Sequence, residues 1–445
     1  MDLEEGYYES PRWTYELPDC SMPLTFDTYS NCAHQCLYCF SFFQRAVGDT
    51  ANDYLHHKVK AVNVEKVKRL FRLELPNHQF NWYIANRHTL QWGGLSDGFD
   101  WYERRFRKSL ELLTFFNEIN YPISVSTKGT WYLDDPAYVE QFQGRKNIHW
   151  KISIITADPA QAAKLEPGTP SPKERVEALR RIKELGIAQT TFRLRPFILG
   201  ASDRTLDELF QMAADAGVDS ISTEFLCIEK RATENLHERY RRISNVIGID
   251  LFPFYLKNSY SGSGLFRLNY DLKRPHYDRM MNLSAKHGIP VYISDAHHKE
   301  KSEACCCCGI RPSADPVGNY FRGQFSEAIQ IARRNGFVRW SDISDDAEGL
   351  KNVPLGRAIG YNQGSTFTRA KFAYHTIYDF MRALWNNPKS WQSPARYFGG
   401  VLVPAESDDS GDLIYLYNRP YVETGYRVAS VDELKAMIGY DRSEQ

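Results

Sequence analysis

Three cysteines that stand close together in the chain have the clearest chemical potential. Cys32, Cys36 and Cys39 have the spacing C-x3-C-x2-C. Three thiolates on one short loop can bind three irons of a [4Fe–4S] cluster, and this spacing supplies no fourth thiolate, so one iron stays open. An open iron beside a cofactor site is a catalytic arrangement rather than a structural one.

Two other interpretations of these cysteines remain open. Residues at positions i, i+4 and i+7 also share one face of a helix, where thiols are often small buried apolar groups. Three thiolates together with His34 could instead bind zinc. The context favours the cluster, because an extended apolar stretch at residues 23–26 is followed by the turn-forming Asp27, Ser30 and Asn31.

The composition is that of an ordinary globular protein. The 445 residues can hold one large domain and a smaller one, and 42% of them are hydrophobic and 25% charged. The 55 basic residues balance the 55 acidic ones, so no global charge attracts nucleic acid. The nine cysteines, odd in number and clustered, favour metal binding over disulfides.

The location predicted from the sequence is cytoplasmic. No apolar run approaches the length of a membrane span. The first residues, Met1 to Glu5, lack the basic and apolar regions of a signal peptide. We therefore expect a protein with reduced thiols and no membrane partner.

Short apolar segments alternate with longer amphipathic ones between about residues 23 and 295, and this alternation predicts a parallel sheet. Six strand–helix units predict an α/β fold, a partial (β/α)6 TIM-type barrel, with its chemistry at the carboxyl ends of the strands. The cysteine loop follows the first strand, as that rule requires. The predicted strands are 24–29, 80–84, 123–126, 150–155, 189–194 and 220–226, and the predicted helices are 62–73, 103–119 and 172–185.

The chain after about residue 295 has a different pattern. A last strand at 289–294 is expected to close or extend the barrel, and an additional C-terminal α+β segment follows it. That segment has predicted helices at 321–334 and 368–384 and a β-hairpin formed by 400–403 and 413–417. The predicted division is an N-terminal extension (1–22), the barrel (23–295) and a C-terminal domain (296–445) whose cysteine cluster covers the barrel mouth.

The cysteine spacing, with Tyr38 directly before the third cysteine, resembles the signature of the radical S-adenosylmethionine (SAM) superfamily. In that family the open iron chelates the amino and carboxylate groups of SAM. An electron from the cluster then cleaves the sulfonium and yields a 5′-deoxyadenosyl radical, which abstracts hydrogen from a substrate. The resemblance implies a radical SAM barrel, a [4Fe–4S] cluster, SAM beside Tyr38, and an electron donor such as flavodoxin or ferredoxin.

Further motifs resemble the spore photoproduct lyase branch of that superfamily in their order and spacing. The resemblance implies that Ser96, Lys128 and Ser153 contact the methionyl part of SAM. A lysine ammonium can neutralise a carboxylate, and hydroxyls can bond to it. Gly93 and Gly94, which lack a Cβ, would let the backbone approach the cofactor. The motifs are Gly93–Asp97 with Glu103, Ser126–Lys128, Lys151–Ser153, Leu165–Pro167 with Arg175 and Gly186, and Arg195–Gly200.

One departure from that branch concerns the hydrogen donor. Spore photoproduct lyases carry a donor cysteine after the second strand, whereas this chain has no cysteine between Cys39 and Cys227. Repair of thymine dimers by the lyase mechanism is therefore not expected. Cys227, at the end of the sixth predicted strand, is the candidate catalytic hydrogen donor, and a buried core thiol is the alternative.

Four consecutive cysteines, Cys305, Cys306, Cys307 and Cys308, precede Gly309. They cannot all point inward from a strand, because its side chains alternate between two faces. Two or three of them could bind a second iron–sulfur cluster or zinc as an auxiliary metal site. A redox-active thiol pair is the alternative. Residues that could complete a metal site are His297, His298 and Cys20.

Three functions remain compatible with the sequence. The first is a radical SAM enzyme, of lyase or transferase type, acting on a nucleic acid base or a nucleotide. The second is a radical SAM enzyme acting on a small molecule or a peptide, and the third is a non-catalytic iron–sulfur or zinc protein. The spaced set of Ser96, Lys128 and Ser153 argues against the third. Basic and aromatic residues that favour the first are Lys66, Lys68, Arg69, Arg72, Arg104, Arg105, Arg107, Lys108, Trp92, Trp101 and Tyr102.

Overall fold

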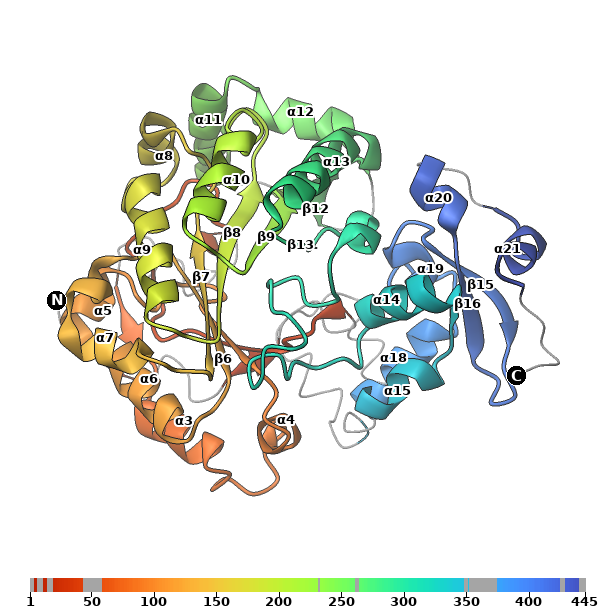
Figure 1. Ribbon diagram of the computed structural model, residues 1–445, viewed down its shortest axis with the longest axis horizontal. Helices are drawn as coiled ribbons and strands as arrows, with labels where there is room; N and C mark the ends of the chain where they lie inside the picture. Colours follow the sequence, from red (N-terminus) through yellow and green to blue (C-terminus); the bar gives the residue numbers. More distant parts are fainter. Residues whose placement is uncertain are drawn as a thin grey trace.

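The structure is a computed structural model that describes residues 4–5, 11–13, 19–42, 58–230, 233–260, 264–347, 351, 374–424 and 429–439. Its centre is a sheet in the order β13-β9-β8-β7-β6-β5-β3-β2, in which every neighbouring pair is parallel except β2 with β3 (Figure 1). Among the described strands β13 does not pair with β2 or β3, so the barrel is open, as expected. The strands are β2 (Arg12–Trp13), β3 (Leu24–Phe26), β5 (Leu90–Trp92), β6 (Ile123–Thr127), β7 (Ile148–Ser153), β8 (Gln189–Phe197), β9 (Ser220–Phe225) and β13 (Val291–Ile293).

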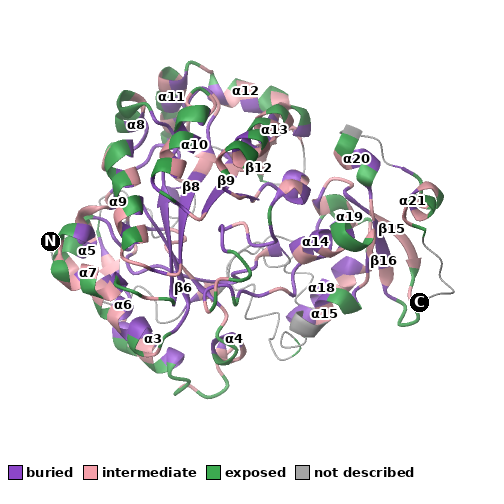
Figure 2. Cartoon of the chain, in the orientation of Figure 1, coloured by how far each residue is buried: buried purple, intermediate pink, exposed green. Residues whose placement is uncertain are grey.

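Helices cover the outside of this sheet, with exposed outer surfaces, while the strands are buried (Figure 2). Two small sheets join strands outside the barrel, β1 (Glu4–Glu5) with β4 (Lys60–Ala61), and β10 (Ile228–Glu229), β12 (Leu265–Leu268) and β11 (Ser259–Tyr260). The helices are α3 (Val64–Phe71), α4 (Asn81–Ala85), α5 (Trp101–Phe106), α6 (Lys108–Glu118), α7 (Pro136–Phe142), α8 (Pro159–Leu165), α9 (Pro172–Glu184), α10 (Leu206–Asp215), α11 (Glu234–Ile247), α12 (Leu251–Asn258) and α13 (Tyr270–His287).

Successive side chains of each strand point to opposite faces of the sheet, which here gives an apolar outer face and a polar inner face. Trp150 of β7 packs outward against Phe99 and Phe142, with ring centroids 4.7 and 4.8 Å apart. Its neighbour Lys151 points to the other face, where Nζ donates to Ser124 Oγ at 2.8 Å. A TIM-type barrel interior is normally filled by branched apolar side chains, so a polar interior indicates a function there. The inner face carries Ser124, Ser126, His149, Lys151, Ser153, Thr191, Arg193, Arg195, Ser220, Ser222 and Glu224.

The predicted second strand is wrong. Most of residues 80–84 form helix α4, and the second barrel strand is β5. Phe80, Tyr83 and Ile84 are the buried residues of this segment, and their spacing places them on one helix face. The true strand has only three residues, which is too short to give a clear periodic signal.

The predicted helix 103–119 is two helices. Helix α5 ends and α6 begins at Arg107, whose φ of 55° lies in the left-handed region. The Glu103 carboxylate accepts hydrogen bonds from the backbone N–H groups of Ser109 and Leu110, each at 2.8 Å. It therefore provides acceptors for N–H groups in the first turn of α6, which have no acceptor within the helix. Helix α9 agrees with its prediction, with a capping box at Ser171 and Gly186 just after its end.

The chain after β13 returns toward the amino ends of the barrel strands. Beyond the 3-10 turn η4 (Ala296–Lys301), Glu303 N–H donates to the Val291 carbonyl at 3.0 Å, so the chain runs back beside β13. The Gly309 carbonyl then accepts a hydrogen bond from Ser220 Oγ at 2.8 Å, at the first residue of β9. Thr89 N–H, just before β5, donates to the Asn319 carbonyl at 3.0 Å. The four-cysteine segment therefore lies at the amino-end edge, and the expectation that it covers the mouth is wrong.

The remaining chain forms a small α+β unit around a three-stranded antiparallel sheet, at one side of the barrel in Figure 1. The predicted hairpin is confirmed as β15 and β16, and the predicted helix 321–334 is largely α14. Residues 368–373 of the other predicted helix lie outside the described residues. The elements are α14 (Phe325–Asn335), β14 (Phe337–Val338), α15 (Ser341–Ala347), α18 (Ile377–Trp385), α19 (Pro394–Tyr397), β15 (Leu402–Ser407), β16 (Leu413–Tyr417), α20 (Arg419–Thr424) and α21 (Val431–Ile438).

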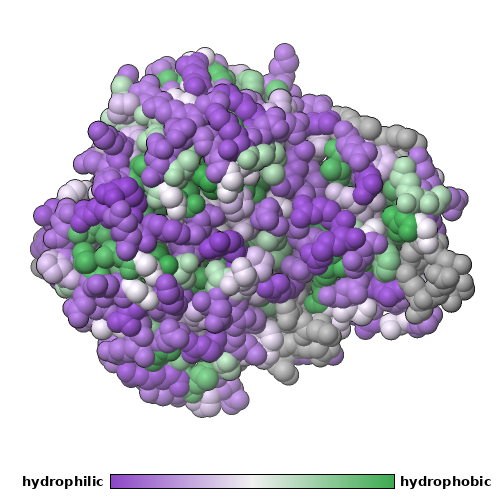
Figure 3. All heavy atoms as spheres, in the orientation of Figure 1, coloured by the Kyte–Doolittle hydropathy of each residue, from purple (hydrophilic) through white to green (hydrophobic). Residues whose placement is uncertain are grey.

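The surface in the view of Figure 3 is mostly hydrophilic, with small separate hydrophobic areas. Within the described part of the chain, no helix combines the length and the apolar character that crossing a bilayer would need.

Candidate active site

One cavity at the carboxyl ends of the barrel strands brings together nearly all the residues predicted for the cluster and the cofactor. Residues that were not singled out from the sequence for a site also line it, including Asp97, Arg193 and Arg239. The inward position of Arg193 on β8 could have been read from strand alternation, whereas Arg239 on α11 comes close only through the fold. The predicted residues in the cavity wall are Cys32, Cys36, Cys39, Gly93, Gly94, Ser96, Lys128 and Ser153.

The cysteine loop is a series of turns and not a helix, so the helix-face interpretation is wrong. It is held from several sides. Ala33 N–H donates to Asp100 Oδ2 at 2.6 Å, and Leu37 N–H donates to the Leu165 carbonyl at 2.9 Å. A Cβ at Gly168 would lie 2.5 Å from the Ala33 carbonyl oxygen, so only glycine permits this approach. Arg239 donates to the Cys36 carbonyl from α11.

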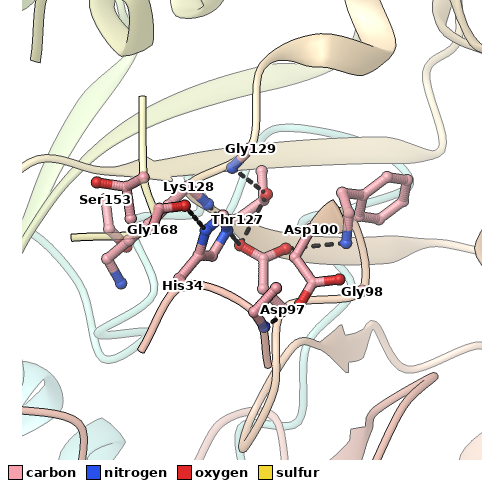
Figure 4. A network of polar contacts seen from close by, with 12 residues as sticks. His34, Asp97, Gly98, Asp100, Thr127, Lys128, Gly129, Ser153 and Gly168 are labelled. Carbon is pink, nitrogen blue, oxygen red and sulfur yellow. Dashed lines mark hydrogen bonds and ion pairs between the residues drawn. The ribbon is translucent and has the colours of Figure 1, made fainter. Parts of the chain in front are cut away.

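His34 forms part of a polar network with Asp97 (Figure 4). Its Nδ1 faces the Gly168 carbonyl and its Nε2 faces Asp97 Oδ2, each at 2.9 Å. Both partners are acceptors, so both ring nitrogens carry protons. Burial opposes the charge, but Asp97 outweighs it and raises the pKa of His34. Neither nitrogen is available to a metal in this arrangement, which argues against the zinc interpretation.

Asp97 also shapes the end of β6. Its Oδ2 accepts hydrogen bonds from Thr127 Oγ1 at 3.0 Å and from the Lys128 backbone N–H at 2.7 Å. Burial favours the protonated acid, but the hydrogen bond and charge of His34 prevail and lower the pKa of Asp97. The charged Asp97 therefore ties the cysteine loop, through His34, to the backbone that presents Lys128.

The Lys128 ammonium lies beside the thiols. Its Nζ is 5.7 Å from the centroid of the Tyr38 ring. Desolvation opposes its charge, but Cys36 and Glu166 outweigh desolvation and raise the pKa of Lys128. A cation is thus held at the wall of the cavity, where an anionic group of a cofactor would be stabilised.

A buried network explains why the Leu165–Pro167 motif and Arg175 occur together. Arg175 Nη2 pairs with Glu166 Oε2 at 2.6 Å, and both side chains are fully buried. Arg175 Nη1 donates to the Ser153 carbonyl at 2.6 Å, and Tyr38 OH donates to Glu166. Burial would raise the pKa of Glu166, but the Arg175 charge prevails and lowers it. The network fixes Tyr38, in the cysteine loop, relative to the end of β7.

Three further predicted cofactor residues, Ser96, Gly93 and Gly94, contact other parts of the protein. Ser96 Oγ donates to the Tyr29 carbonyl at 2.6 Å, which leaves only acceptor capacity for a ligand. A Cβ on Gly93 would lie 2.6 Å from the Ser126 carbonyl oxygen, and one on Gly94 would collide with the Thr25 hydroxyl. Both glycines thus permit close packing of protein against protein beside the cavity.

The three cysteines have the donor chemistry of an iron–sulfur site. Burial and the Asp100 carboxylate raise the pKa of Cys32, and burial raises the pKa of Cys36 to about 12. Ligation would therefore displace thiol protons. Their thiols line one cavity, but in the described part of the chain no three Cys, His, Asp or Glu side chains are gathered closely enough to hold a metal ion as they stand.

The other cysteines lie elsewhere in the barrel. Cys227 is not among the residues lining the cavity, and its sulfur accepts a hydrogen bond from Arg267 Nη1 at 3.6 Å. Burial raises the pKa of Cys227 to about 11, so it keeps its hydrogen at neutral pH. Cys307 accepts a hydrogen bond from Arg195 Nη1 at 3.9 Å, whereas the hydrogen-bond partners of Cys305 are Glu327 and Tyr320. The adjacent thiols therefore have different surroundings.

The predicted nucleic-acid surface is only partly present. Trp92 is fully buried and donates its indole N–H to Thr28 Oγ1 at 3.0 Å, so it cannot stack on a base. Trp101 is 49% exposed, with Arg104 over its ring at 5.2 Å. The other predicted basic residues include several in local ion pairs or over aromatic rings: Lys68, Arg69, Arg72, Arg105, Arg107 and Lys108.

Comparison with known proteins agrees with this site. Residues 27–213, a little under half of the chain, match the family model described as the Radical SAM superfamily. An uncharacterised protein of Mycobacterium tuberculosis and one of Mycobacterium bovis are each 25% identical in an alignment 234 residues long, which covers 49% of this chain. The alignment covers 66% of each relative, just under two thirds of its length.

Solved structures of spore photoproduct lyase share the fold. A variant with bound AdoMet and dinucleoside spore photoproduct is 16% identical, with a TM-score of 0.50, over 65% of this chain and 80% of that one. The lyase complexed with dinucleoside spore photoproduct is 17% identical, also with a TM-score of 0.50, over 65% and 81%. The expected partial barrel with an additional C-terminal α+β segment is thereby confirmed.

Proposed function

We propose that this protein is a radical SAM enzyme. A [4Fe–4S] cluster on Cys32, Cys36 and Cys39 would supply the electron that cleaves SAM to a 5′-deoxyadenosyl radical, which abstracts hydrogen from a substrate. The observation that carries the proposal is the single cavity whose wall contains these three thiols together with Lys128 and Ser153.

The side chains around the cavity would hold SAM by its methionyl part. Lys128 would neutralise the carboxylate. Ser153 Oγ accepts a hydrogen bond from Arg193 Nη1 at 3.2 Å, so its own proton remains free to donate to the cofactor. Ser96 would accept from the amino group, and Tyr38, Gly93 and Gly94 would complete the wall.

Replacing Lys128 with alanine should weaken SAM binding and leave the iron content unchanged. Loss of a charge-assisted hydrogen bond costs about 1.5–3 kcal/mol, or roughly 10- to 100-fold in Kd. Titration of the reconstituted variant with SAM measures this. The exposed Lys164 of α8 gives a matched control, Lys164→Ala, and unaltered affinity in Lys128→Ala would remove Lys128 from the site.

We propose a nucleic acid base or a nucleotide as the substrate. Its support is the fold shared with a lyase whose structures hold a dinucleoside photoproduct, together with the exposed Trp101 and Arg104. The alternatives are a small molecule or peptide substrate, or a non-catalytic iron–sulfur or zinc protein. Anaerobic reconstitution and reduction with SAM, followed by mass spectrometry for 5′-deoxyadenosine with DNA, RNA or metabolite extracts added, distinguishes them.

Cys227, which keeps its hydrogen, is the proposed hydrogen donor that completes turnover.

The consecutive cysteines are proposed as an auxiliary site, either a second iron–sulfur cluster or zinc, or a redox-active pair. With Cys32, Cys36 and Cys39 replaced, residual iron or zinc should remain and should disappear when residues 305–308 are also changed to serine. Elemental analysis of the two variants measures this. A first variant free of metal would exclude the metal site and favour the redox pair, because Cys307 and Cys308 are hydrogen-bonded to each other.

The proposed setting is the cytoplasm, with flavodoxin or ferredoxin as the electron donor. Every cysteine in the described residues is free, which suits a reducing compartment. Reduction of the reconstituted protein by each carrier, followed through the cluster absorbance, tests the donor.

A further inference from the structure

Two basic side chains on the inner face of the barrel have no ion-pair partner in the described part of the chain. Lys151 is 1% exposed, and its ammonium donates to the Ser124 hydroxyl; Arg193, which is partly buried, donates to the Ser153 hydroxyl. Among the described residues, neither has a carboxylate within ion-pair distance. By contrast, Arg195, two residues along the same strand, pairs with Glu224. Buried charges are normally paired, because an unpaired one costs several kcal/mol.

Two hydroxyls beside these cations are also unsatisfied. Ser126 and Ser222 are 7% and 1% exposed, and neither Oγ has a hydrogen-bond partner in the described structure. Ser126 is the strand neighbour of Lys151, and Ser222 is the strand neighbour of Arg193. Buried polar groups nearly always have partners. Two basic side chains without an ion-pair partner and two hydroxyls without a hydrogen-bond partner therefore lie on one inner face that lacks an anionic acceptor for them.

Groups already in the barrel do not supply that acceptor. The thiols of residues 306–308 lie near Lys151, and that of Cys308 also lies near Arg193. However, in the described structure neither Lys151 nor Arg193 donates a hydrogen bond to any of these sulfurs, whereas Cys307 accepts one from Arg195 Nη1 at 3.9 Å. Glu224 is engaged by Arg195 and lies 3.9 Å from Arg267. The missing partner is thus an anion that enters from outside.

We propose that Arg193, supported by Lys151 and by the hydroxyls of Ser126 and Ser222, binds a carboxylate or phosphate group of the substrate. This rests on the proposed function, because Arg193 and Ser126 line the same cavity as the cluster cysteines. A guanidinium binds such groups in a two-pronged fashion and fixes their orientation. The substrate is then an acidic molecule, anchored in the barrel interior with its reacting carbon toward the cofactor. A mononucleotide satisfies this description.

The carboxylate of SAM is the competing source of the anion. Lys128, directly after β6, already faces that position from the side of Tyr38 and Cys36. Arg193 lies two strands away on β8, close enough for the two positive charges to repel each other. The two cations would therefore serve different anions, one on the cofactor and one on the substrate.

Calorimetric titration of the full-length reconstituted protein with inorganic phosphate, and separately with malonate, tests the proposal. At least one of the two should bind, and Arg193→Gln should weaken that binding by roughly tenfold or more, a larger factor than any loss of SAM affinity that follows from losing the hydrogen bond to Ser153. Preference for one probe identifies phosphate or carboxylate chemistry. Arg193→Lys should retain part of the affinity, which separates loss of charge from misfolding. Arg180→Gln, on the exposed face of α9, is the matched control.

Equal binding of both probes by Arg193→Gln and wild type would overturn the proposal, as would no binding of either probe by wild type. Weakened SAM binding in Arg193→Gln, with probe binding intact, would assign Arg193 to the cofactor instead and also overturn it. The titration needs neither SAM nor reduction. It therefore remains informative if the protein proves unable to cleave SAM, and a failure of SAM cleavage is distinguishable from a failure of anion binding.

Discussion

Replacing Cys32, Cys36 and Cys39 together with alanine is expected to remove about four iron atoms per chain, the content of one [4Fe–4S] cluster. The three thiols line one cavity, and no other described cysteine lies in its wall, so nothing can replace them. SAM cleavage should then fall to background. Iron analysis after anaerobic reconstitution and detection of 5′-deoxyadenosine after reduction measure the two effects.

Cys227→Ser is the control for this experiment, because Cys227 is not among the residues that line the cavity. That variant should retain the iron and still release 5′-deoxyadenosine, even if product formation stops. Unchanged iron in the triple variant would contradict the assignment of the cluster to this loop.

Replacing Glu166 with glutamine is expected to destabilise the protein by about 3–5 kcal/mol, the usual cost of leaving one charge of a buried pair alone. Arg175 would then be a fully buried cation without its carboxylate. Tyr38 would lose the charged acceptor of its hydroxyl, which should loosen the cysteine loop and lower the iron retained. Urea denaturation and iron analysis of the same preparations measure both consequences.

Glu177→Gln provides the matched comparison, because Glu177 pairs with Arg180 on the surface of α9, with side chains 50% and 44% exposed. Such a surface pair contributes about 0–1 kcal/mol. If both variants lost equally little stability, the buried pair would not hold the loop in place.

The sequence alone predicted the iron–sulfur chemistry proposed for the cysteine loop. The spacing of Cys32, Cys36 and Cys39 is local, so it can be read without the fold. The barrel class followed from the strand–helix alternation, since each unit carries its own periodic signal. The prediction failed at residues 80–84, where the apolar spacing fits a helix and the true strand, β5, is only three residues long.

The tertiary structure alone decided which distant groups meet. His34 could be assigned to zinc from the sequence, but the fold places Asp97 and the Gly168 carbonyl against its two nitrogens. Trp92 could have stacked on a base, but strand pairing turns it into the core. The chain returns beside β13 and carries residues 305–308 to the amino-end edge. Such outcomes depend on contacts between segments far apart in the chain, which local patterns do not encode.

The polar inner face of the barrel depends on both the sequence pattern and the tertiary structure. Alternation of apolar and polar residues along β6 to β9 is visible in the sequence, because side chains alternate along a strand. Which set points inward depends on which face the helices cover, and that is settled only when the apolar set packs against them. The fold thereby places Arg193 and Lys151 inside the barrel, where removal from water makes an unpaired charge costly and turns two strand residues into a site for an anion.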